Sequence, residues 1–158
     1  MEIFEMAPPE GGPSLALHGG AGGRPRELTP GERAAYEQGL LAAYRAGWQV
    51  LSAGGDVLEA VCASVEVLED DPLFNAGRGA ALTATGNAEL DASVMTGSGR
   101  AGAVAAARYA RSPVRLARAV MERTEHVLIV DPPAEFRGDL RAGTHAARLR
   151  RGTGRRRR

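Results

Sequence analysis

The chain has 158 residues, the length of one ordinary domain, with 44% hydrophobic residues and a net charge of +1. Its single cysteine, Cys62, excludes an internal disulfide framework, and no apolar run approaches the roughly 18 residues of a membrane span. Residues 1–13 are acidic and rich in proline and glycine, unlike a secretory signal. We therefore expect a cytoplasmic protein with no membrane partner.

The charges divide the chain unevenly. Residues 1–131 carry 11 arginines and 17 acidic residues, a balance of −6, whereas residues 132–158 carry 9 arginines and 2 acidic residues, a balance of +7. We expect a disordered leader at 1–13, a folded body at 14–131 and an arginine-rich, aberrant or disordered tail at 132–158, because the tail is too poor in apolar residues to form a core.

The first half of the body reads as a short strand followed by two helices. Residues 14–18 are expected to form the strand. Thr29, Pro30 and Glu32 form a capping box with proline at the first helical position, and the apolar period continues to Leu51. The inward positions of this helix are expected to be Tyr36, Leu40, Ala43, Tyr44, Gly47 and Leu51.

A second helix is expected to begin at Asp56 and to end before Pro72. Cys62 falls within it and is expected to pack as a small apolar residue. The buried stripe of this helix is expected to contain Val57, Val61, Ser64, Val65 and Leu68.

The second half of the body reads as strands interrupted by one helix. Residues 80–85 and 88–95 are expected to pair as a hairpin, residues 102–109 to form a central strand and residues 126–130 a last short strand. A helix opens at Ser112-Pro113, with Leu116, Ala117 and Val120 inward. This order predicts an α+β fold with helices on one face of a mainly antiparallel sheet.

Three motifs stand out in chain order. The first is a glycine cluster, His18-Gly19-Gly20-Ala21-Gly22-Gly23, whose spacing fits no phosphate-binding loop. The second is Asp71-Pro72-Leu73-Phe74-Asn75-Ala76-Gly77-Arg78-Gly79, and the third is Glu89-Leu90-Asp91-Ala92-Ser93-Val94-Met95. Together they resemble the first-subunit half of the isoaspartyl peptidase and plant-type L-asparaginase family of N-terminal-nucleophile hydrolases. The resemblance runs from about Leu15 to Val130.

The resemblance implies a fold and a set of site residues. The fold is a partial αββα sandwich with helices outside the sheets. His18, Gly19 and Gly20 would belong to the autoprocessing loop, and Asn75 would lie beside the nucleophile. No organic cofactor is implied, and a structural sodium ion is allowed. Its donors would be the backbone carbonyl oxygens of Leu68, Glu69, Asp71, Phe74, Ala76 and Arg78. On the evidence of its own strand, Asp91 reads as a general base, as a surface residue or as a loop anchor.

The family's catalytic threonine opens a second half that we do not recognise in this sequence. Gly143-Thr144 and Gly152-Thr153 are not followed by the small apolar strand that the family places there. We therefore expect a truncated asparaginase that is inactive alone and lacks its second-half partner and substrate clamp. The complete enzyme would act on the asparagine side-chain amide or on β-aspartyl peptides. The alternative is a non-catalytic protein whose basic tail binds nucleic acid, although Phe136 is the tail's one aromatic residue for stacking on bases.

Overall fold

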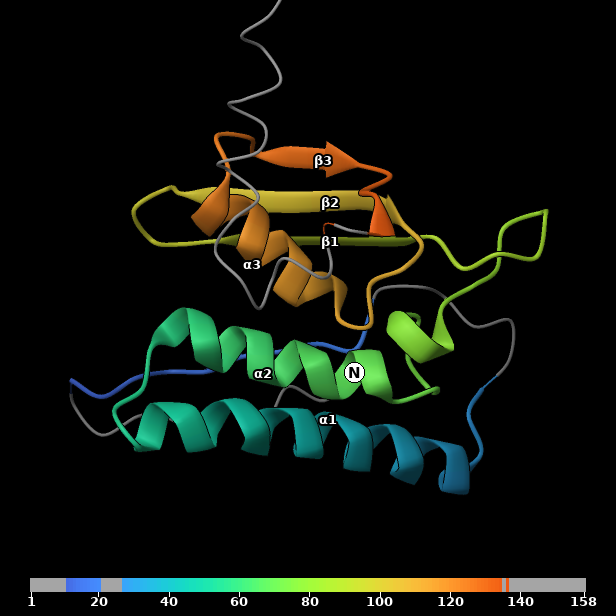
Figure 1. The fold of residues 1–158 in the computed structure, drawn as a ribbon. Helices are drawn as coiled ribbons and strands as arrows, with labels where there is room; N and C mark the ends of the chain where they lie inside the picture. Colours follow the sequence, from blue (N-terminus) through green and yellow to red (C-terminus); the bar gives the residue numbers. More distant parts are fainter. Residues whose placement is uncertain (1–10, 21–26, 135, 137–158) are drawn as a thin grey trace, which may run out of the picture. The chain divides into compact units, whose positions relative to one another are not determined.

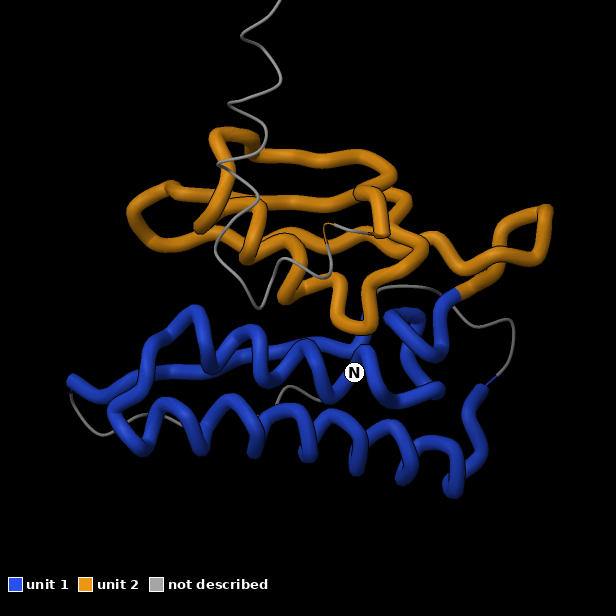
Figure 2. The backbone as a smooth tube through the Cα atoms, in the orientation of Figure 1, with its two compact units in different colours: residues 1–80 blue, residues 81–158 orange. Residues whose placement is uncertain are grey.

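The computed structural model describes residues 11–20, 27–134 and 136. The chain divides into two compact units, residues 1–80 and residues 81–158, and each is described by itself (Figure 2). Within these described residues the elements are three α-helices and one small sheet, an α+β composition. None of the helices in these residues has the length and apolar character to cross a membrane.

The first unit contains helices α1 (Pro30–Ser52) and α2 (Val57–Asp70), which lie side by side (Figure 1). The predicted capping box of α1 is confirmed, because the Glu32 backbone N–H donates to Thr29 Oγ1 over 3.2 Å and Thr29 N–H donates to Glu32 Oε2 over 2.9 Å. Asp56 caps α2 as predicted, since its Oδ2 accepts from the Glu59 N–H at 3.0 Å.

The two helices approach closely where their facing residues are small. A Cβ built on Gly47 of α1 would collide with Ser64 Oγ and would stand 2.9 Å from the Ala60 carbonyl oxygen of α2. The buried residues of α1 recur every four positions and include this point of close approach. They are Gly39, Ala43, Gly47 and Leu51.

The predicted buried stripe of α2 is wrong in its first two members. Val57 is 66% exposed and Val61 is 39% exposed, whereas Ala60 and Ser64 are buried. Close helix approach selects the small residues at these positions and turns the neighbouring valines outward, a tertiary effect that apolar periodicity does not register. Cys62 is fully buried, as predicted.

The predicted strand at residues 14–18 does not form. These residues are described and are irregular, because the described part of the first unit offers no strand with which they could pair. After α2 the chain forms a compact loop that contains the short 3-10 helix η1 (Gly77–Gly79).

The second unit is a three-stranded sheet with one helix against it. Its strands are β1 (Leu90–Met95), β2 (Ala101–Ala107) and β3 (Leu128–Val130), in the order β1-β2-β3 (Figure 1). The predicted central strand is therefore confirmed as β2. Along β1 the odd-numbered positions Asp91, Ser93 and Met95 are exposed and alternate with less exposed residues, the two-residue period of a strand with one face covered.

The predicted hairpin is wrong in its partner strand. β1 pairs antiparallel with β2, whereas residues 80–85 contribute only a single bridge between Leu82 and Ala88. The Thr83 N–H donates to the Asn87 carbonyl and the Gly86 N–H to that of Thr83, both over 2.9 Å. These bonds close a tight loop, and no ladder continues from it.

The sheet is mixed rather than mainly antiparallel. β2 runs parallel to β3, and α3 (Pro113–Arg123) forms the crossover between them. α3 packs on the sheet with Leu116, Ala117 and Val120 buried, as predicted. Parallel neighbouring strands need a long crossover connection, usually a helix, so the order strand, helix, strand was compatible with this pairing.

The predicted leader and tail lie almost entirely outside the described residues. Within the tail, Phe136 is described and is 5% exposed. Gly143-Thr144 and Gly152-Thr153 also lie outside the described part of the chain.

Candidate functional site

Phe74 fixes the loop of residues 71–79 that follows α2. Its side chain is 3% exposed, and its ring meets the Tyr36 ring edge to face at a centroid distance of 5.5 Å. A Cβ built on Gly19 would stand 2.6 Å from Phe74 Cε1, and one on Gly39 of α1 would stand 2.7 Å from Phe74 Cε2. The first two sequence motifs therefore meet at this ring.

Backbone hydrogen bonds hold the 71–79 loop in an irregular, compact conformation. The Phe74 N–H donates to the Asp71 carbonyl over 3.3 Å, the Ala76 N–H to that of Phe74 over 2.8 Å and the Gly79 N–H to that of Ala76 over 3.0 Å. In addition, Asp71 Oδ1 accepts from the Leu73 N–H at 2.9 Å. A succession of short-range bonds of this kind fixes where each carbonyl oxygen points.

Two glycines allow carbonyl oxygens of α2 and of the loop to approach the loop interior. Gly77 has φ +44°, and a Cβ on it would collide with the Glu69 carbonyl oxygen. A Cβ on Gly79 would collide with the Phe74 carbonyl oxygen and would stand 2.6 Å from that of Pro72. Space that only glycine leaves open is thus lined by backbone oxygens.

This loop suits a monovalent cation better than a side-chain metal site. In the described residues, no group of three or more His, Cys, Asp or Glu side chains could hold a metal. Leu68 and Glu69 lie in the last turn of α2, where carbonyl groups lack helical partners and carry partial negative charge. The carbonyls of Asp71, Phe74 and Ala76 each accept one bond and retain a second lone pair. The residues present therefore fit the predicted sodium site, which stays a prediction.

The other predicted site residues of the first unit have simpler surroundings. His18 Nδ1 accepts from the Gly20 N–H at 3.2 Å, a local hydrogen bond within the glycine segment. His18, Gly19 and Gly20 are exposed, as is Asn75, which directly follows the buried Phe74. The autoprocessing role of the glycine segment and the role of Asn75 stay predictions.

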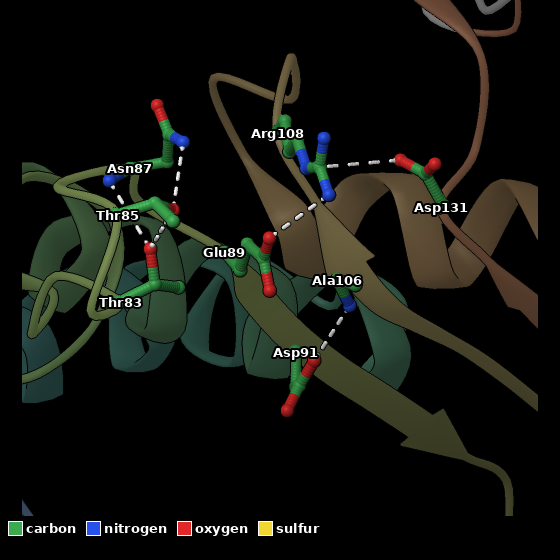
Figure 3. Close-up of polar contacts among 8 residues, drawn as sticks. All are labelled: Thr83, Thr85, Asn87, Glu89, Asp91, Ala106, Arg108 and Asp131. Carbon is green, nitrogen blue, oxygen red and sulfur yellow. Dashed lines mark hydrogen bonds and ion pairs between the residues drawn. The ribbon is translucent and has the colours of Figure 1, made fainter.

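Asp91, from the third motif, anchors a strand irregularity. Its Oδ1 accepts from the Ala106 N–H at 2.8 Å, beside a register shift in the β1–β2 pairing between Leu90 and Ala92 (Figure 3). Ala106 has φ +52°, a left-handed conformation that costs energy in a non-glycine residue. Of the roles considered for Asp91, this hydrogen bond agrees with the anchor.

A second polar group on this sheet was not found from the sequence. Arg108 Nη2 lies 3.0 Å from Glu89 Oε1, and Arg108 Nε lies 4.0 Å from Asp131 Oδ1, so the arginine connects residues at the ends of all three strands (Figure 3). The groups are partly exposed, so the ion pairs add little stability. The sequence did not reveal this group because the register of β1 against β2 was not known from it.

We expect Asp91→Ala to destabilise the second unit by about 1 kcal/mol, because the Ala106 N–H loses its acceptor while the strained backbone remains. Ser93→Ala is the matched control, since Ser93 is exposed on the same face of β1. Urea unfolding of the two variants measures the difference. Equal midpoints would show that the Asp91 bond contributes nothing.

The sequence of the chain matches a known protein family. The model of the asparaginase family matches residues 11–138, which is most of the chain. The chain belongs to the asparaginase family. The match extends past Val130, where the sequence resemblance had been expected to end, and it includes the buried Phe136.

Curated members of the asparaginase family are similar to the chain over the same region. It is 46% identical over 123 residues to an isoaspartyl peptidase of Salmonella typhimurium, covering 77% of the chain and 39% of the relative. It is 41% identical over 128 residues to a rat isoaspartyl peptidase/L-asparaginase, covering 80% and 38%. The human protein of the same name is 40% identical over 123 residues. The chain thus spans less than two fifths of the length of these relatives.

Proposed function

We propose that this chain supplies the first-subunit portion of an amidohydrolase that acts on the asparagine side-chain amide or on β-aspartyl peptides. The observation that carries the proposal is the family match over residues 11–138, with relatives named isoaspartyl peptidase and L-asparaginase. The meeting of the glycine segment and the 71–79 loop at Phe74 supports it, because this contact holds two family motifs together.

In this proposal the chain provides a scaffold, and a second-half segment provides the nucleophile. The hydroxyl of an N-terminal threonine in that segment attacks the amide carbon, and the threonine α-amino group takes the hydroxyl proton. The amine or ammonia leaves with a proton, and water then hydrolyses the acyl ester. Phe74 fixes the loop that carries Asn75, the residue placed beside the threonine.

The proposed fold is part of an αββα sandwich. Residues 14–131 would form the first-subunit portion, between a leader at 1–13 and an arginine-rich tail at 132–158. At the end of α2 and in the 71–79 loop, sodium would be held by the carbonyls of Leu68, Glu69, Asp71, Phe74, Ala76 and Arg78. When bound, the ion neutralises the converging oxygens and takes no part in bond breaking. A cytoplasmic location and the autoproteolytic origin of the threonine complete the proposal.

The first test is ammonia release from L-asparagine. We expect none from the purified 158-residue protein, because in this proposal the threonine nucleophile belongs to the second-half segment. A chimera of residues 1–138 with the second-half segment of the Salmonella relative should release ammonia and should lose this activity when its N-terminal threonine is replaced by alanine.

Two results would contradict the proposal. One is ammonia release by the 158-residue protein that Thr144→Ala abolishes, since the nucleophile would then lie in this chain. The other is a folded chimera that acts neither on L-asparagine nor on a β-aspartyl dipeptide.

A further inference from the structure

The C-terminal end of α2 combines several negative groups. Glu69 and Asp70 lie in its last turn and Asp71 is its C-cap residue, and the last turn contains no basic residue. The exposed carbonyls at a helix C-terminus carry the negative end of the helix dipole, so a nearby cation is favourable and acidic residues are not. Such a helix end is stabilised by positive charge from elsewhere in the chain.

Arg78 supplies that positive charge from within the chain. It lies in η1, eight residues after Asp70, and its Nη1 donates to the Asp70 carbonyl oxygen over 3.2 Å. This contact connects the two ends of the loop. A hydrogen bond from a charged donor is stronger than one between neutral groups.

The guanidinium and the proposed sodium ion would use different oxygens of the same turn. The proposed sodium donors in this turn are Leu68 and Glu69, followed by Asp71, and the Asp70 carbonyl between them accepts from Arg78. Two positive charges would then stabilise one set of carbonyl dipoles, and each would weaken the binding of the other through repulsion.

We propose that the Arg78 guanidinium is a built-in cation of the 71–79 loop, which holds the loop closed without a bound monovalent cation. This inference rests on the proposed sodium loop and goes beyond it, because it assigns a role to the side chain of a residue whose carbonyl alone was implicated. It makes Arg78 a positioning residue for the loop that carries Asn75.

The test is hydrogen exchange of the loop amides in the full 158-residue chain. The N–H groups of Phe74, Ala76 and Gly79 are bonded inside the loop and report its opening. Exchange is measured in sodium chloride and in choline chloride at equal ionic strength. In choline, Arg78→Met should exchange about tenfold faster than the natural chain at these amides, the effect of losing one charge-assisted bond. Sodium should restore most of the protection.

Two further variants separate charge from packing. Arg78→Lys keeps one positive charge and should retain most of the protection in choline. Arg45→Met is the matched control, because Arg45 is an exposed arginine of α1 with no side-chain hydrogen bond or ion pair to the described residues; it should leave loop exchange unchanged.

The inference is overturned if Arg78→Met exchanges like the natural chain in choline, or if its faster exchange is the same in both salts. The first result removes any role for the guanidinium, and the second makes it a simple tie that a cation cannot replace. Because exchange is read without catalysis, these failures are distinct from a failure of the proposed activity, which is read from ammonia release.

Discussion

Replacing Phe74 by alanine is expected to lower the free energy of unfolding of the first unit by about 3–5 kcal/mol, the usual cost of removing a buried aromatic side chain. The ring is 3% exposed and packs against Tyr36, Gly19 and Gly39. Without it, the 71–79 loop loses its contact with both α1 and the glycine segment. Urea denaturation followed by helical circular dichroism measures the change.

Leu73→Ala is the control for this prediction. Leu73 is the preceding residue of the same loop and is 39% exposed, so its truncation should cost less than about 1 kcal/mol. Phe74→Leu should fall between the two, because leucine fills part of the cavity. Equal losses for Phe74→Ala and Leu73→Ala would mean that the ring does not anchor the loop.

The helices of the first unit could be predicted from local chemistry. Thr29 and Asp56 each accept a hydrogen bond from the N–H three residues later, and Pro30 occupies a position where a missing N–H costs nothing. Such signals act within one turn, so no knowledge of the tertiary structure was needed. The face of α2 that is buried depended instead on where Gly47 allows close approach.

The sheet was predicted less well, because strand pairing is a long-range choice. Residues 80–85 and the residues of β2 could both have paired with β1, and the sequence favoured the nearer segment. The actual partner, β2, has seven small residues and packs against α3. The irregularity at Ala106 also escaped prediction, since the hydrogen bond that accompanies it comes from the side chain of Asp91 on the neighbouring strand.

The candidate site, too, could be predicted only in part. The motif pointed to the 71–79 loop and to its carbonyl oxygens, but only the structure shows Phe74 as its anchor and Arg78 as a donor to Asp70. Both contacts join segments whose separation along the chain hides them. What the sequence specified was the backbone chemistry of the loop, and what it left open was which side chains hold that backbone in place.

We expect Gly77→Ala to destabilise the first unit by about 3 kcal/mol, from ~1 kcal/mol for a left-handed alanine and the remainder for overpacking. Gly77 has φ +44°, and the new methyl group would collide with the Glu69 carbonyl oxygen. That oxygen is a proposed cation donor, so displacing it should also abolish any protection of the loop by sodium. Urea unfolding and loop hydrogen exchange measure the two effects.

Gly86→Ala separates the cost of the left-handed backbone from the cost of the steric collision. Gly86 has φ +80°, also a left-handed conformation, but a Cβ there would meet no heavy atom within 4 Å apart from its chain neighbours. Its substitution should therefore cost only the ~1 kcal/mol of conformational strain. If both variants lose the same stability, the close approach of Glu69 to Gly77 has no energetic consequence. If Gly77→Ala retains sodium protection, the Glu69 carbonyl is not a cation ligand. The converging carbonyls would then act only as hydrogen-bond acceptors within the protein.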